Sequence, residues 1–142
     1  MQEFIDLLSP NIKLISYIQN GDTFIFDVES KIEEPICPYC HKSASRKHST
    51  YTKSFMDLPL NNHKVLIRVK NRKMFCDNKE CKHKTFAETY DFVDRKSKKT
   101  NRLKKYILDT STNMSSIAAQ NLLRKNGVQI GKSTICAFYK KK

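Results

Sequence analysis

The sequence lacks tryptophan and has little glycine or proline, with three Gly and four Pro among 142 residues. So few chain breakers exclude a flexible low-complexity protein. Membrane-spanning runs are missing as well, because no apolar stretch approaches the ~18 residues that a transmembrane helix needs. The N-terminus, Met1 to Phe4, has no basic segment followed by an apolar one, so it does not resemble a signal peptide. We therefore expect a folded cytoplasmic protein of one domain or two small modules.

Acidic residues are scarce, since 14 Asp and Glu face 27 Lys and Arg and the net charge is +13. The imbalance is uneven: residues 1–35 hold two basic and seven acidic residues (net −5), and residues 36–142 hold 25 and seven (net +18). A positive field of this size favours a polyanionic partner, and nucleic acid is the usual one. An anionic membrane surface is the alternative, but no basic amphipathic helix with a large apolar face supports it.

Cysteine is well represented, and four of the five cysteines form two close pairs. Two residues separate Cys37 from Cys40, and four separate Cys76 from Cys81. In a reducing compartment, paired cysteines are typical of a metal site rather than of disulfides. A structural zinc ion takes four tetrahedral ligands. We therefore predict one structural Zn²⁺ bound by Cys37, Cys40, Cys76 and Cys81.

Two alternatives to this ligand set remain open. His41 or His83 could replace one cysteine, or the four cysteines could be free and buried. His48 and His63 are expected at the surface or close to DNA rather than on the metal. A site with four protein ligands has no open position, so the predicted zinc is structural and not catalytic. A ribbon this small should also need the metal in order to fold.

Local patterns predict an α+β fold. Residues 3–9 favour a short helix, and Asn20-Gly21 between two strand-like runs favours a hairpin. The strand-like runs are 12–18, 23–29, 54–59, 64–70 and 73–76, with a turn expected at 71–72 and a proline ending the run at 59. In the fourth run Val65, Ile67 and Val69 should share one face. The expected order is an N-terminal helix and β-hairpin (1–34), a small four-cysteine zinc ribbon of antiparallel strands (35–92), a basic linker (93–102) and a helix-turn-helix (103–142).

The segment Arg95–Lys105 has seven basic residues and no acidic one. It is either a solvated linker or an arm that contacts DNA phosphates, and the charge of the whole chain favours the arm. Beyond it the apolar spacing becomes helical. Two sets of residues recur at i, i+3 and i+4, which is the spacing of a helix. They are Leu103, Tyr106, Ile107 and Thr110, and Met114, Ile117, Ala118 and Leu122.

The helices expected at Ser115–Lys125 and Lys132–Lys140, with a stop at Asn126-Gly127 between them, have the layout of a helix-turn-helix. An ordinary helical hairpin is the alternative. In a helix-turn-helix the second helix enters the major groove of DNA. Cys136, the unpaired cysteine, would lie on this helix. The residues expected to contact DNA are Lys132, Ser133, Cys136 and Lys140 in the helix, and Arg95, Lys96, Lys98, Lys99 and Arg102 in the arm.

Catalytic residues are not expected. The sequence has no Gly-rich phosphate loop and no evident Ser-His-Asp or Cys-His set. Its acidic residues beyond residue 36 are scattered, so a two-metal carboxylate site is not indicated.

Five segments, together with Cys81, form a frame around the cysteines: Ile36–His41, His48–Tyr51, Asp57–Pro59, Lys73–Cys76 and Lys84–Glu88. In content and order this frame resembles the N-terminal region of bacterial insertion-sequence transposases of the ISL-three family. The resemblance implies a hairpin, a four-cysteine zinc ribbon and a helix-turn-helix. In the family a DDE-type catalytic domain follows, and it has no counterpart in the sequence up to Lys142.

Carried onto this sequence, the resemblance implies that the four paired cysteines bind zinc and that the helix from Lys132 reads DNA. The target would be double-stranded DNA, at the inverted repeats that end an insertion sequence. The protein would be bacterial, nucleoid-associated, free of transposase activity, and either a monomer or a homo-oligomer. The alternative function is a zinc-ribbon interaction protein that contacts a protein or an RNA without reading DNA sequence. Only the first function needs the helix Lys132–Lys140.

Overall fold

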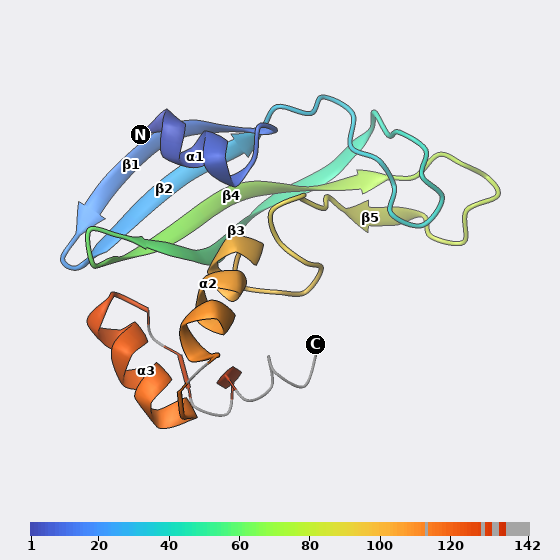
Figure 1. Cartoon of the computed structure of the whole chain (residues 1–142). Coiled ribbons are helices and arrows are strands. Elements are labelled where there is room, and N and C mark those ends of the chain that lie inside the picture. The colour runs from blue at the N-terminus through green and yellow to red at the C-terminus, as the bar shows by residue number, and fades with distance from the viewer. Residues whose placement is uncertain (113, 129, 132–133, 136–142) are drawn as a thin grey trace.

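The computed structural model describes residues 1–112, 114–128, 130–131 and 134–135. Strands and helices are both present in this part of the chain, in agreement with the predicted α+β class (Figure 1). In chain order the elements are α1 (Gln2–Leu8), β1 (Ile12–Asn20), β2 (Thr23–Ser30), β3 (Lys47–Leu60), β4 (His63–Phe75), β5 (Thr85–Ala87), α2 (Asn101–Ser111) and α3 (Ser116–Lys125). Each helix within the described ranges is too short or too polar to span a lipid bilayer.

The strands form one sheet in the order β1-β2-β4-β3, and β5 pairs with the far end of β4. Neighbouring strands are antiparallel except for β2 and β4, which run parallel. The sequence did not predict this parallel pair. Because of this parallel pair, β2 of the N-terminal hairpin and β4, which leads to the second cysteine pair, share backbone hydrogen bonds. One sheet therefore contains strands from both sides of residue 35, where the predicted zinc ribbon begins.

Two of the predicted strand boundaries are wrong. β4 runs without a break from His63 to Phe75, so there is no turn at Asn71-Arg72, because both residues pair with β3. β3 begins at Lys47 and is much longer than the predicted run from residue 54. Pro59 lies inside β3, at a break in its register close to the end of the strand. The long pairing of β3 with β4 outweighs the local turn preferences of these residues.

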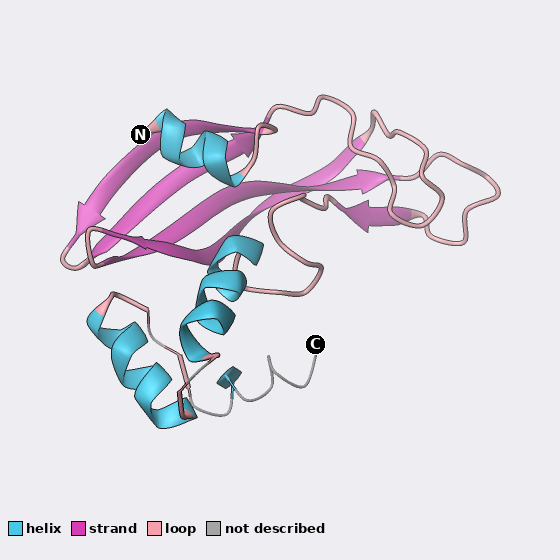
Figure 2. Ribbon diagram, viewed as in Figure 1, coloured by secondary structure: helices cyan, strands magenta, loops and turns pink. Residues whose placement is uncertain are grey.

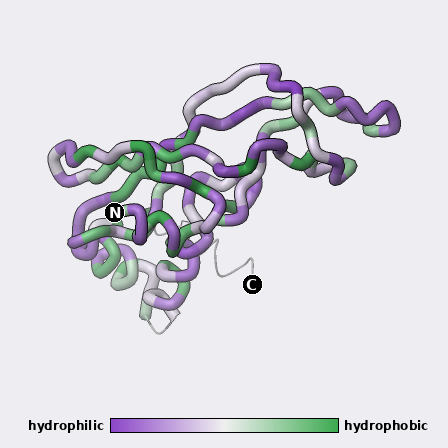
Figure 3. The backbone as a smooth tube through the Cα atoms, turned by 90° about the horizontal axis from the view of Figure 1, so that it is seen from above, coloured by the Kyte–Doolittle hydropathy of each residue, from purple (hydrophilic) through white to green (hydrophobic). Residues whose placement is uncertain are grey.

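The main core lies on one face of the sheet. Val65, Ile67 and Val69 are 0–1% exposed, which confirms the predicted face of β4. They pack with Phe26 of β2 and with Ile5 of α1. Hydrophobic stretches are interspersed with hydrophilic ones along the tube in Figure 3.

α2 and α3 form a second core with the opposite face of β3, through Met56 and Leu58 (Figure 2). The buried apolar residues of the two helices are Leu103, Ile107, Ala119 and Leu123. The helical spacing predicted for these two segments is confirmed by α2 and α3, although Met114, Ile117 and Leu122 are 37%, 55% and 39% exposed. The adjacent stripe of α3 is buried instead, and its small Ala119 allows α3 to lie close to α2.

α3 ends at the glycine that the sequence indicates. Gly127 has a φ of +90°, and the N–H of Val128 donates to the carbonyl of Leu123 at 2.7 Å, as in a Schellman motif. A Cβ at position 127 would lie 2.8 Å from the backbone oxygen of Asn62, in the turn between β3 and β4. The end of α3 is thus seated directly on the sheet.

Candidate metal centre and basic segment

The four paired cysteines meet at one end of the sheet. Their Sγ atoms all lie within 4.8 Å of one another, with 4.0 Å between Cys37 and Cys81 and 3.6 Å between Cys40 and Cys76. A zinc ion with four thiolates at ~2.3 Å sets the sulfur atoms about 3.8 Å apart. The four cysteines thus fit a structural Zn²⁺ site, as predicted.

The first pair lies in a tight turn between β2 and β3. The N–H of Cys37 donates to the carbonyl of Lys42 at 2.9 Å, and the N–H of His41 donates to the carbonyl of Cys37 at 2.8 Å. His41 takes a left-handed φ of 63°, which closes the turn. These bonds direct the thiols of Cys37 and Cys40 to the same side.

β4 leads directly into the second pair. The N–H of Cys76 donates to the carbonyl of Lys84 at 2.8 Å, and the N–H of Cys81 donates to the carbonyl of Asn78 at 3.0 Å. The Asn78 side chain also accepts from the N–H of Glu80 at 3.1 Å. A turn built on Asn78 therefore spans the wider spacing of this pair.

A small apolar cluster joins the two turns. Ala44, Met74 and Phe86 are buried against the cysteines, and the last two are paired across β4 and β5. Figure 1 shows the two cysteine loops side by side at this end of the sheet. The apolar surface buried in this cluster is too small to stabilise the two cysteine turns alone, so a metal ion would supply much of their stability.

The thiols influence each other's protonation. The side chain of Asn78 and then the backbone at Lys42 lower the pKa of Cys40 to about 6. The backbone N–H of Asn78 acts in the same direction on Cys76, but burial and the neighbouring thiols outweigh it and raise the pKa of Cys76 to about 12. Four thiolates cannot share this space without a cation at their centre, and a divalent metal ion supplies that charge.

The histidines near the site are not ligands in this arrangement. The described residues that gather as a metal-binding group are the four cysteines alone. His83 stacks on Tyr39 with ring centroids 3.6 Å apart and an interplanar angle of 14°. The guanidinium of Arg95 lies over Tyr39, 4.7 Å from its centroid, and donates a hydrogen bond to its hydroxyl. Sequence reasoning missed this stack, although Tyr39 stands between two ligands and His83 follows a third.

The basic segment after Arg95 is attached to the sheet. The carbonyl of Lys98 accepts from the N–H of Met56 at 2.8 Å, and the N–H of Thr100 donates to the carbonyl of Met56 at 2.9 Å. The backbone around Lys99 therefore extends the sheet beyond β3. Arg95, Lys96 and Lys98 are exposed, and Lys99 is half-buried.

Arg102 differs from the other basic residues because its guanidinium faces inward. It donates from Nε to Oδ1 of Asp57 at 2.9 Å and from Nη2 to Oδ2 at 2.5 Å. The Asp57 carboxylate is fully buried, and it also accepts from the Thr100 hydroxyl at 2.7 Å. Thr100 in turn caps α2 by accepting from the N–H of Leu103. Asp57 thus fixes the start of α2 against β3.

The predicted DNA-reading residues Lys132, Ser133, Cys136 and Lys140 lie outside the described residues. Around them, Val128, Ile130 and Ile135 are 1%, 8% and 0% exposed and belong to the core of α2 and α3. The chain beyond α3 is therefore anchored to that core at three apolar positions.

Comparison with known proteins gives a partial match. No curated protein and no solved structure matches the chain. Residues 33–81, which include all four zinc-binding cysteines, match a family model described as the zinc-finger of transposase IS204/IS1001/IS1096/IS1165. The metal centre at the end of the sheet is therefore similar to the zinc ribbon of these transposases, and its four cysteines leave no ligand position open.

Proposed function

We propose that this protein is a zinc-dependent DNA-binding module of a transposase, and that it binds the terminal inverted repeats of an insertion sequence. The observation that carries the proposal is the match of residues 33–81 to a transposase zinc-finger, in a segment whose four thiols lie within 4.8 Å. The net charge of +13 supports nucleic acid as the partner.

In this proposal the zinc ion promotes DNA binding indirectly, because it holds protein segments in place. Tyr39 lies between the first two ligands and supports Arg95, the first residue of the basic segment. His83, next to the last ligand, supports Tyr39 from its other side. Zinc binding would therefore fix both cysteine turns and, through the stacked rings, the start of the basic segment. Loss of zinc should weaken DNA binding even though the metal does not contact DNA.

Three lysines of the basic segment are the proposed phosphate contacts, although one of them, Lys99, is half-buried. Lys96, Lys98 and Lys99 lie on backbone that is hydrogen-bonded to β3 or held close to it, so their positions are partly ordered before DNA binds. Such preorganisation lowers the entropy cost of binding. Arg102 is left out of this set because its donors bind Asp57.

Sequence reading is assigned to a helix-turn-helix that includes α3 and the helix expected at Lys132–Lys140. The burial of Val128, Ile130 and Ile135 supports it, because these residues would hold the second helix against α2 and α3. Lys132 and Ser133 would lie at the N-terminal end of that helix, the part that meets base edges.

The protein is proposed to bind DNA without cleaving it. The metal-binding group within the described ranges has four cysteine ligands and no open position. DNA cleavage by two metal ions would need a cluster of carboxylates instead.

The test is binding of duplexes that carry the inverted repeats, compared with random duplexes of equal length, over a range of salt concentrations. Lys132→Ala should weaken binding to the inverted repeat by ~1–3 kcal/mol and leave random DNA unaffected. Replacing both Lys98 and Lys99 by Ala should weaken binding to every duplex and reduce the log–log salt slope by up to ~2. If Lys132→Ala changes neither duplex or both equally, the helix does not read sequence.

One observation favours the alternative, a protein-interaction function. β1 lies at the edge of the sheet, and its Ile15, Tyr17 and Ile18 are 52%, 48% and 53% exposed. An edge of this kind can pair with a strand of another protein. Failure of DNA binding, together with a partner that protects β1 amides from hydrogen exchange, would favour this function.

A further inference from the structure

A pocket of about 350 Å³ lies on the core side of the sheet, between β3 and the loop over residues 87–96. None of the four cysteines lines it. Phe55, Tyr90 and Val93 provide apolar walls, and Lys53 and Lys96 provide ammonium groups. We propose that this pocket binds a backbone phosphate of the nucleic acid, an inference that rests on the proposed function.

The acidic groups of the pocket are already neutralised from outside it. The Glu88 carboxylate is 2.7 Å from the guanidinium of Arg72, and the Asp94 carboxylate is 3.1 Å from the ammonium of Lys104. Among the described residues, no carboxylate lies within ion-pair distance of Lys53 or Lys96. The pocket therefore keeps two uncompensated positive charges.

Lys53 is a charged residue on the core-facing side of β3. It shares this side with Phe55 and Asp57, and its ammonium lies 5.8 Å from the centroid of the Phe55 ring. The residue is only half-exposed, and it lines the pocket. An anion in the pocket would therefore find a positive charge on this wall.

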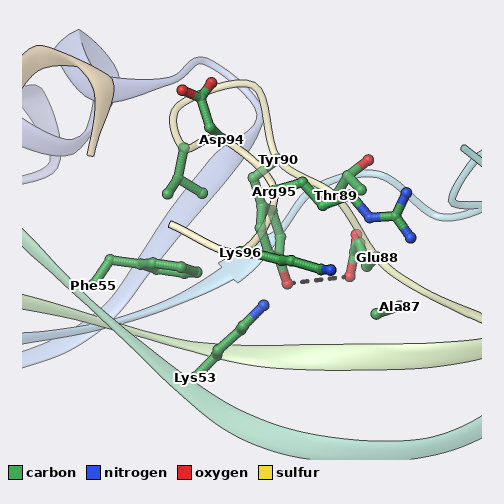
Figure 4. A pocket seen from close by; sticks show the side chains of 10 residues that line it. Lys53, Phe55, Ala87, Glu88, Thr89, Tyr90, Asp94, Arg95 and Lys96 are labelled. Carbon is green, nitrogen blue, oxygen red and sulfur yellow. Dashed lines mark hydrogen bonds between the residues drawn. The ribbon is translucent and has the colours of Figure 1, made fainter. Parts of the chain in front are cut away.

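Lys96 approaches the same space from the opposite wall. It has a left-handed φ of 66°, in a turn closed by the Ser97 N–H donating to the carbonyl of Asp94 at 3.0 Å. Glycine would take this conformation without strain, whereas lysine does so at a cost. Figure 4 shows the nitrogen ends of Lys96 and Lys53 directed toward the region of Glu88 and Tyr90. The strained turn thus delivers a second ammonium to the pocket.

The chemistry fits phosphate in particular. Each ammonium has three donors, and the two groups enter from different walls, which suits an ion with several acceptor oxygens. The apolar walls can accept the sugar beside it. The loop that carries Lys96 continues into Lys98 and Lys99. A nucleic-acid strand bound by the basic segment would therefore pass the mouth of the pocket.

Lysine footprinting tests this directly. Zinc-loaded protein is acetylated with an amine-reactive ester, with and without a duplex at saturating concentration, and each lysine is quantified by mass spectrometry. Lys53 and Lys96 should be protected by DNA several-fold, while Lys13 on the outer strand β1 should not. A mobility-shift assay on the same samples shows how much protein is bound. DNA binding without protection of Lys53 overturns this inference alone, and absence of DNA binding overturns the proposed function as well.

Three variants that each lose one positive charge complete the test. Lys53→Gln and Lys96→Gly should each reduce the salt slope by about 0.9 for any duplex, and Lys13→Gln should leave it unchanged. Lys96→Gly should also keep or raise the melting temperature, because it relieves the left-handed φ. Its loss of affinity therefore cannot be a folding defect. Slopes for Lys53→Gln and Lys96→Gly equal to that of Lys13→Gln would overturn the inference.

Discussion

Arg102 offers the sharpest contrast between a structural and a DNA-binding role for a basic residue. Replacing it with alanine leaves the Asp57 carboxylate, whose side chain is 0% exposed, with only the Thr100 hydroxyl as partner. The change also removes the contact of the guanidinium with the Phe4 ring, at 4.5 Å. Removing one partner of a buried ion pair costs about 3–5 kcal/mol. Because Arg102 is 20% exposed, we expect a value near the lower end, ~3 kcal/mol.

The assay is thermal and urea unfolding of the zinc-loaded protein, followed by circular dichroism. A loss of ~3 kcal/mol corresponds to a drop of roughly 6–12 °C in melting temperature for a domain of this size. Lys105→Ala is the matched control, since it removes one positive charge from an exposed position of the same helix. Asp57→Asn added to Arg102→Ala should recover part of the loss, because the buried charge is then gone. If Arg102→Ala unfolds within ~0.5 kcal/mol of Lys105→Ala, Arg102 is not a structural residue.

Three further predictions concern the helix end, the sheet and the metal site. Gly127→Ala should destabilise the protein by more than ~1 kcal/mol in urea unfolding, because φ is +90° and the new Cβ would lie 2.8 Å from the Asn62 oxygen; an unchanged midpoint would refute this packing. The hydrogen bond from Arg68 lowers the pKa of Asp27 in the folded protein below the ordinary value of 3.8. The ion pair therefore stabilises the fold fully above pH 3.8, and this stabilisation is lost as the pH falls through the pKa of Asp27 in the folded protein. Arg68→Gln should therefore flatten the stability curve below pH ~4 in acid titrations. Cys40→Ser should reduce bound zinc from one equivalent per chain in metal analysis, and a full equivalent in the variant would contradict the ligand set.

The sequence predicted the parts of this molecule that depend on spacing within one segment. Two cysteine pairs with short gaps identified the metal ligands, and alternation identified the buried face at Val65, Ile67 and Val69. The parallel pairing of β2 with β4 could not be foreseen, because alternation shows which face is buried but not which strand lies alongside.

Polar contacts between residues far apart in the sequence could not be predicted either. Arg102 was placed with the DNA contacts because it lies among six other basic residues, yet Asp57 is 45 positions away in sequence. The buried stripe of α3 could not be predicted for a related reason, since Ile117 and Leu122 are more apolar than the Ala119 that the packing selects. The pocket of Lys53 and Lys96 arises only when β3 and the later loop come together.

The proposed role of the zinc ribbon is to position a DNA-binding surface. It is tested most directly by measuring the affinity of one preparation for an inverted-repeat duplex when zinc-loaded, after zinc removal by a chelator under reducing conditions, and after zinc is restored. We predict one zinc per chain, strong binding in the loaded protein, loss of most of the affinity on removal, and recovery on restoration. Equal affinity with and without zinc, or no affinity in the fully loaded protein, would contradict the account.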